Sequence, residues 1–267
     1  MNINQPTTIA NPWQDLKQFT PARIALGRAG MSLPTQAHLE FQLAHALARD
    51  AVHIPLDFAV LAQSLQPLGF PTLTLQTQAE NQRMYLQRPD LGRLLSLSAT
   101  ESLKNNMIGT TDVAIVVADG LSSKAIAQHA VSFLDLLLIE LKKQNYSLSP
   151  LCLVKHGRVA IGDAIAEQFA ARLCIVLIGE RPGLSSPDSM GIYFTFHAKS
   201  GISTDAERNC ISNIHHNGLS YSEALRKLLF LIAEAEKLQL SGVNLKDETT
   251  DSALNSEQPQ TNFLLVQ

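Results

Sequence analysis

A continuous apolar run at residues 173–178 does most to limit the possible folds of this chain. The run is rich in β-branched residues, is short for a helix and stops at Gly179, which is typical of a strand buried on both faces. Such strands lie inside parallel sheets, and open α/β sheets bind ligands at the carboxyl ends of these strands. Glu180 and Arg181 therefore stand at a predicted ligand edge, and the alternative is that they are solvated loop charges.

Two similar runs precede this one, at residues 113–118 and 151–154, and each leads through a polar turn into a helical pattern. The helical patterns cover residues 125–141, where a preceding serine can cap the helix, and residues 162–171. Alternation of strands and helices at this spacing predicts right-handed crossovers and a parallel sheet. Residues 191–196 are predicted to add a further strand.

The part of the chain before residue 111 is predicted to be mostly helical. Thr35 is expected to cap a helix that ends near Val52, and residues 88–96 are expected to form a helix with Pro89 in its first turn. At the other end of the chain, the segment Ser220-Tyr221-Ser222-Glu223 matches a capping box and predicts a long final helix.

Composition excludes several classes of protein. The net charge of -3 and the absence of a local Lys/Arg cluster argue against nucleic-acid binding. Cys152, Cys174 and Cys210 include no C-x-x-C pair, so neither a disulfide framework nor a cysteine zinc site is expected. The apolar segments are too short to cross a membrane and the first residues do not resemble a secretory signal. We therefore expect a soluble, intracellular protein.

No signature of a serine hydrolase, zincin, dinucleotide fold or P-loop is present. His215 and His216 are adjacent and are interpreted as loop residues, because neighbouring side chains rarely reach one metal ion. Asp119 and Asp163 stand near strand or helix ends, where capping explains them as well as catalysis does. No catalytic residue and no metal ligand is predicted, which points to a binding subunit.

Several segments together resemble the small subunit of the ethanolamine ammonia-lyase family. They span residues 20–214, and the combination is far more specific than any one segment. In chain order they are TPARIALGRAGMSLPT, HALARDAVH, RPDLGR, VADGLS, HGRVAIGDAIAE, LIGERPGLSSPDS and DAERNCISNI.

The resemblance implies an α/β protein in which a mostly helical N-terminal region is followed by a Rossmann-like C-terminal domain with a parallel sheet. We expect a mobile arm at residues 1–19, the helical domain at 20–110, the cobalamin-cradling domain at 111–245 and a disordered tail at 246–267. The resemblance also implies a partner, a large barrel subunit, with which this chain forms a hetero-oligomer. Ethanolamine is expected to be bound mainly by the large subunit, and the small chain is expected to be inactive alone.

The implied cofactor is adenosylcobalamin, whose cobalt-carbon bond breaks to start a radical reaction that yields acetaldehyde and ammonia. The family's cofactor-contacting positions correspond to Val159, Glu180 and Cys210. Val159 and Cys210 can give apolar wall to a corrin ring, and Glu180 can accept bonds from its amide groups. The alternatives are a core valine, a loop charge and a buried small residue. No D-x-H-x-x-G motif is present, so the cofactor is expected to keep its own benzimidazole on cobalt.

Two functions remain open from the sequence. One is a lid and cradle for the cofactor, which closes the site against the large subunit. The other is a non-catalytic α/β protein that binds a small molecule or serves as a structural partner. The expected location is the cytoplasm, either free or inside a bacterial microcompartment.

Overall fold

The structure is a computed structural model that describes residues 7–106 and 109–247. Its strands form one six-stranded sheet in the order β1-β3-β2-β4-β5-β6. The strands are β1 Thr72–Gln76, β2 Val113–Ala118, β3 Leu151–Lys155, β4 Leu173–Gly179, β5 Met190–Phe196 and β6 Arg208–Ile214. The α-helices are α1 Thr35–His53, α2 Phe58–Leu65, α3 Gln82–Gln87, α4 Leu97–Asn105, α5 Ser123–Lys143, α6 Ile161–Gln168 and α7 Tyr221–Leu238. Short 3-10 helices are η1 Gln14–Phe19, η2 Gln66–Leu68, η3 Leu91–Arg93, η4 Asp205–Glu207 and η5 Gly242–Asn244.

The centre of the sheet is parallel, as the alternating pattern predicted. β2 pairs in parallel with both β3 and β4, and β1 joins the far side of β3. Every residue of β2 and β4 is buried, which explains why both read as unbroken apolar runs. The α/β fold class is confirmed. The last two strands differ, because β5 returns antiparallel to β4 and β6 pairs antiparallel with β5.

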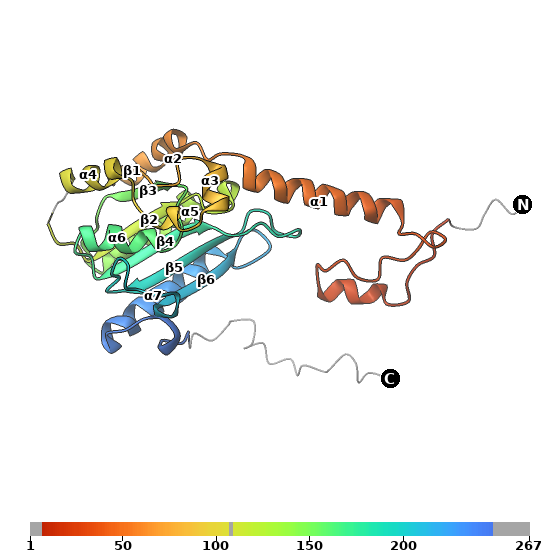
Figure 1. Cartoon of the computed structure of the whole chain (residues 1–267). Helices are drawn as coiled ribbons and strands as arrows, with labels where there is room; N and C mark the ends of the chain where they lie inside the picture. Colours follow the sequence, from red (N-terminus) through yellow and green to blue (C-terminus); the bar gives the residue numbers. More distant parts are fainter. Residues whose placement is uncertain (1–6, 107–108, 248–267) are drawn as a thin grey trace, which may run out of the picture.

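Helices cover the two faces of the sheet unequally (Figure 1). α2, α5 and α7 pack on one face in a core that extends from β3 to β6. α4 and α6 pack on the other face, where the buried cluster draws on β1 to β4. On this second face Tyr193 of β5 is half-buried and Cys210 of β6 is exposed. The part of the β5–β6 pair that carries Tyr193 and Cys210 is therefore left accessible on the side of α6.

A crevice is expected where adjacent parallel strands send their chains to opposite faces. The chain leaves β2 toward α5 on one face, and it leaves β3 toward α6 on the other. β2 and β3 are neighbours in the sheet. The carboxyl ends of these two strands, with the adjoining end of β4, are thus the place where this topology provides a ligand site.

The helix starts followed the capping signals in two of three cases. Ser122 Oγ accepts a bond from the N–H of Ala125 at 3.2 Å and caps α5. Ser220 and Glu223 form the predicted capping box of α7. Thr35, by contrast, is the first helical residue of α1, and Pro34 occupies the N-cap without a side-chain bond. The fixed backbone of a proline starts this helix without needing a hydroxyl cap.

The predicted helix at residues 88–96 is wrong. Arg88 Nε and Nη2 instead bond the carboxylate of Asp90 across a turn, and only Leu91–Arg93 forms a 3-10 turn. Gly92 in that turn accepts a bond from the backbone N–H of Arg158 at 2.8 Å. A long-range contact with the chain after β3 has therefore replaced the helix that local propensity favoured.

Strand β1 lies within the region predicted to be mostly helical, and pairs with β3 along its whole length. Before it, α1 projects from the body of the protein and leads to the N-terminal segment (Figure 1). Only Ala44 and Ala51 of α1 are buried. The predicted disordered tail lies outside the described residues from position 248 onward. Among the residues that are described, no helix has the length and apolar character needed to span a membrane.

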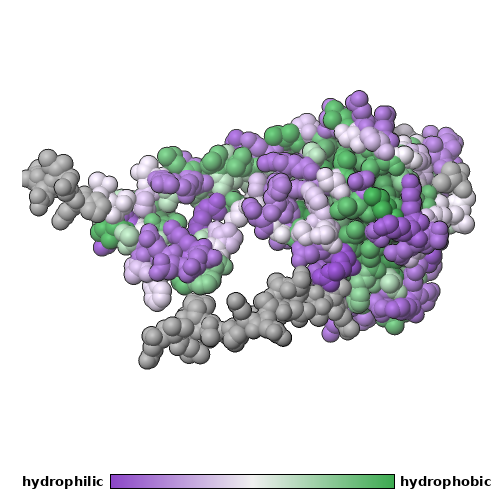
Figure 2. Space-filling view, turned by 180° about the vertical axis from the view of Figure 1, so that it is seen from behind, coloured by the Kyte–Doolittle hydropathy of each residue, from purple (hydrophilic) through white to green (hydrophobic). Residues whose placement is uncertain are grey.

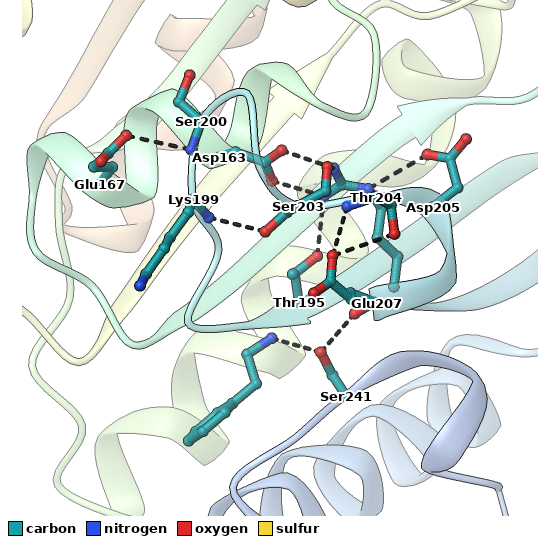
Figure 3. Close-up of polar contacts among 12 residues, drawn as sticks. Asp163, Glu167, Thr195, Lys199, Ser200, Ser203, Thr204, Asp205, Glu207 and Ser241 are labelled. Atoms are coloured by element: carbon teal, nitrogen blue, oxygen red, sulfur yellow. Dashed lines mark hydrogen bonds and ion pairs between the residues drawn. The ribbon is translucent and has the colours of Figure 1, made fainter.

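Asp163 forms a buried ion pair that joins α6 to the antiparallel strands (Figure 3). Its two carboxylate oxygens accept bonds of 2.6 and 2.7 Å from Nη1 and Nη2 of Arg208, and both side chains are nearly inaccessible. Arg208 Nη1 also donates to Thr195 Oγ1 at 3.3 Å. Through Arg208, Asp163 therefore links α6 to β5 and β6.

Candidate functional site

A pocket of about 450 Å³ lies at the carboxyl ends of β2, β3 and β4. Val159 comes from the turn between β3 and α6, and Glu180 directly follows β4. The lining residues are Tyr85, Leu121, Arg158, Val159, Ile178, Gly179, Glu180, Arg181 and Tyr193. Two of the three residues selected from the sequence thus share one cavity at the predicted edge of the sheet.

Asp119 holds the turns after β2 and β3 together. Its buried carboxylate accepts bonds from the backbone N–H groups of Gly120 at 2.9 Å, His156 at 2.9 Å and Gly157 at 3.2 Å. Burial raises the pKa of this carboxyl, whereas the three N–H donors and the nearby His156 act in the opposite direction. Three of the about four acceptor positions of this carboxylate are taken by backbone N–H groups, so Asp119 fixes the two turns relative to each other.

The turns after β2 and β4 approach closely because both carry glycine. A Cβ on Gly120 would lie 2.2 Å from the carbonyl oxygen of Gly179, and the φ of Gly120 is +62°. A Cβ on Gly179 would lie 2.1 Å from the carbonyl oxygen of Ser122. The N–H of Leu121 donates to Gly179 O at 2.9 Å. The packing of these two turns therefore fixes the backbone from which the Glu180 side chain extends.

The carboxylate of Glu180 is oriented from one side. Ser189 Oγ and the backbone N–H of Asn213, the latter at 3.1 Å, both donate to Oε2. Oε1 lies over Gly191, only 2.9 Å from the place that a Cβ would occupy. Within residues 7–106 and 109–247, no donor is bonded to Oε1. One oxygen therefore positions the side chain and the other is available as an acceptor.

Tyr193 connects the pocket to Cys210. Tyr193 lines the pocket, and Cys210 is its direct partner in the β5–β6 pairing, so both side chains lie on the same sheet face. The Tyr193 hydroxyl and the Cys210 thiol are near enough to affect each other's pKa. Surrounding atoms desolvate the thiol and raise its pKa; the nearby Tyr193 opposes this shift, and the nearby Glu180 adds to it. Cys210 is thus a neutral thiol at pH 7 beside the pocket.

Cys210 itself lines a neighbouring pocket of about 620 Å³ that runs along β6 and α7. The structure therefore brings Val159 and Glu180 together and leaves Cys210 one side chain away, across Tyr193. Pattern analysis missed Tyr193, because a half-buried residue inside an apolar strand reads as core. It also missed Arg158 as a site residue, although Arg158 directly precedes Val159. His215 and His216 lie in the loop after β6, as predicted.

Comparison with known proteins gives a consistent result. The model of the family described as ethanolamine ammonia-lyase light chain (EutC) matches residues 10–246. A Pseudomonas aeruginosa protein named ethanolamine ammonia-lyase small subunit is 52% identical over 260 residues, which cover 96% of this chain and 95% of the relative. A protein of the same name from Azotobacter vinelandii is 52% identical over 269 residues and covers 99% of both chains. A third, from Pseudomonas fluorescens, is 51% identical over 261 residues.

Proposed function

The chain belongs to the family of ethanolamine ammonia-lyase small subunits, and from this premise we propose that it binds adenosylcobalamin and closes the cofactor site against the large subunit. As a small subunit, it is one chain of a two-chain lyase and has a large subunit as its partner. We assign ethanolamine binding mainly to that partner. The proposed cofactor contacts of this chain are Val159, Glu180 and Cys210.

The shape and chemistry of the site fit one side of a corrinoid. Corrinoids are larger than the molecules that a pocket of about 450 Å³ encloses, so only part of the cofactor would enter. The pocket adjoins the accessible sheet face that carries Tyr193 and Cys210. A broad, mostly apolar disc edged with amides matches such a surface. The single observation that carries the proposal is that Val159 and Glu180, which are distant in sequence, line one pocket beside Cys210.

Each residue has a distinct part in holding the cofactor. Glu180 Oε1 accepts a bond from a corrin amide N–H, and its negative charge makes that bond stronger than a neutral one. Val159 and the Cys210–Tyr193 pair supply apolar wall that excludes water from the reacting centre. When bound, adenosylcobalamin supplies the radical chemistry that abstracts hydrogen from the substrate. The residues of this chain orient the cofactor and shield it from water.

The variant Glu180→Ala tests the assignment in the complex with the large subunit. Loss of a charged acceptor is expected to weaken cobalamin binding by roughly 5- to 100-fold. Spectrophotometric titration of the purified complex with cyanocobalamin measures the Kd. Glu101→Ala, at an exposed position on α4, is the matched control and is expected to bind like the wild type. Equal affinity in the Glu180→Ala complex would remove Glu180 from the site.

Thermal unfolding of the same variants separates binding from folding, because Glu180 also accepts bonds from Ser189 and Asn213. Glu180→Ala is expected to lower the affinity for cobalamin by more than the drop in its unfolding temperature can explain.

The subunit assignment has its own test, which is deamination of ethanolamine by co-expressed chains. Activity that requires both chains and adenosylcobalamin excludes the alternative of an unrelated binding or structural protein.

We further propose that the assembled enzyme resides in the cytoplasm or in a bacterial microcompartment. This location is what the resemblance to the family implied. Fractionation of cells grown on ethanolamine, with detection of both subunits, distinguishes the two.

A further inference from the structure

Arg158 is held rigidly at the wall of the pocket by an aromatic ring. Its guanidinium carbon lies 4.2 Å from the centre of the Tyr85 ring, and Nη2 donates to the Tyr85 carbonyl oxygen at 3.2 Å. Tyr85 is fully buried, and its hydroxyl donates to the carbonyl oxygen of Gly157 at 3.2 Å. A stacked guanidinium of this kind is a fixed group rather than a mobile surface charge.

Gly92 makes room for the stem of the same side chain. A Cβ at Gly92 would lie 2.9 Å from Arg158 Cγ, so a larger residue would push the arginine from its place. The backbone N–H of Arg158 donates to Gly92 O at 2.8 Å. The 3-10 turn at residues 91–93 and the ring of Tyr85 thus confine Arg158 from two sides.

The donors of Arg158 are largely unmatched. Its Nε is buried and has no hydrogen-bond partner among the described residues. In the part of the chain that the structure describes, the Tyr85 carbonyl is the only acceptor bonded to this guanidinium. Buried polar groups without partners are rare and costly, and they call for an explanation. A ligand that brings a hydrogen-bond acceptor into the pocket explains why this arginine is held in place with unused donors.

The surroundings favour an anionic acceptor. Arg181 lines the same pocket and adds a second positive charge. Glu180 is the only carboxylate among the lining residues, and one of its oxygens is already bonded by Ser189 and Asn213. The first N–H groups of α6 donate to the carbonyls of residues 158–160, so the arginine rather than the helix end is free to bind an anion.

We propose that Arg158 binds the phosphodiester of the nucleotide loop of cobalamin. The inference rests on the proposed function. The phosphodiester is the one anionic group at the periphery of this cofactor, and the planar fork of an arginine matches phosphate oxygens better than a point charge does. Arg158 thereby divides the recognition with its neighbours: Glu180 takes amide donors, Val159 packs on apolar surface, and Arg158 takes the anion.

The test uses the complex of both subunits and cyanocobalamin as the probe. Arg158→Gln is expected to raise the Kd by roughly 10- to 100-fold. Arg158→Lys keeps the charge and loses the fork, so an intermediate Kd is expected. Arg93→Gln makes the same charge change at an exposed arginine that lines another pocket, and is expected to bind like the wild type. Thermal unfolding of each complex checks that the variants are folded.

The phosphorus-31 NMR resonance of bound cyanocobalamin reports the contact directly. At saturation, the resonance in the Arg158→Gln complex is expected to move from its wild-type position toward that of the free cofactor. Unchanged affinity overturns the inference. Weakened affinity with an unchanged bound resonance also overturns it, because Arg158 would then act on another part of the cofactor. A wild-type complex that fails to bind cyanocobalamin instead refutes the proposed function itself.

Discussion

His129 is a buried histidine of α5 that contacts the start of α7. Its Nδ1 lies 2.7 Å from the Tyr221 hydroxyl, and the residue is almost completely buried. Burial lowers the pKa of His129; Asp188 acts against this shift, and His216 and His215 add to it. The neutral ring is therefore the form that the folded protein accommodates.

This environment predicts a pH-dependent stability. Since the folded-state pKa lies below the ordinary value of about 6.5, the stabilisation is complete above that pH and is lost as pH falls through the folded-state pKa. Between about pH 7.5 and about pH 5.5, the unfolding temperature of the wild type is expected to fall more steeply than that of His129→Gln. Replacement of the exposed His53 by glutamine is the control. Parallel curves for wild type and His129→Gln would contradict the prediction.

At the scale of elements, the site depends on how closely two turns pack. The turns after β2 and β4 touch through Gly120 and Gly179, and Asp119 ties the first of them to the turn after β3. Ser122 Oγ also donates to Pro187 O at 2.8 Å, so the start of α5 holds the β4–β5 loop. The carboxyl edge of the sheet is therefore a set of interlocked turns that carries Val159 and Glu180 on a rigid base.

Gly179→Ala is expected to disturb this base. The new methyl group would overlap the Ser122 carbonyl, and overpacking of this kind costs roughly 1 to 3 kcal/mol. Urea denaturation measures the loss in free energy of unfolding. Gly183→Ala is the matched control in the same loop, because its nearest atom would lie at an ordinary 3.4 Å. If both variants unfolded at the same urea concentration, the close contact would not be present in solution.

At the scale of the whole molecule, the body and the projecting α1 differ in how far their apolar side chains are buried. Apolar residues are visible along the projecting segment as well as on the body (Figure 2). Leu43 of α1 is 59% exposed, whereas Leu137 of α5 is fully buried between the sheet and neighbouring helices. The stability of the isolated chain should therefore come from the body.

A pair of leucine substitutions measures this difference. Leu137→Ala leaves a cavity and is expected to cost about 2 to 5 kcal/mol of unfolding free energy. Leu43→Ala, also inside a helix, is expected to change it by less than about 0.5 kcal/mol. Chemical denaturation of the isolated chain provides both values. A large loss from Leu43→Ala would mean that α1 packs against other parts of the chain in solution.

Much of the sheet and several of its helices were determined by the sequence itself. β2, β3 and β4 are continuous apolar runs, and Ser122 and Ser220 start α5 and α7, because burial pattern and capping are local properties. The position of Glu180 after a buried strand is equally local. The strand pattern placed Glu180 at the ligand edge, the resemblance alone selected Val159 and Cys210, and the role of all three with the cofactor stays a prediction.

Only the tertiary structure decided which of these segments meet. β1 and β6 read weakly because they are partly exposed and carry polar residues, and pairing with β3 and β5 makes them strands. The register of β5 on β6 sets Tyr193 opposite Cys210, and the packing of Tyr85 and Gly92 confines Arg158. Such arrangements depend on residues far apart in the chain, whose packing energy outweighs local preference. The periodicity within one segment therefore cannot predict them.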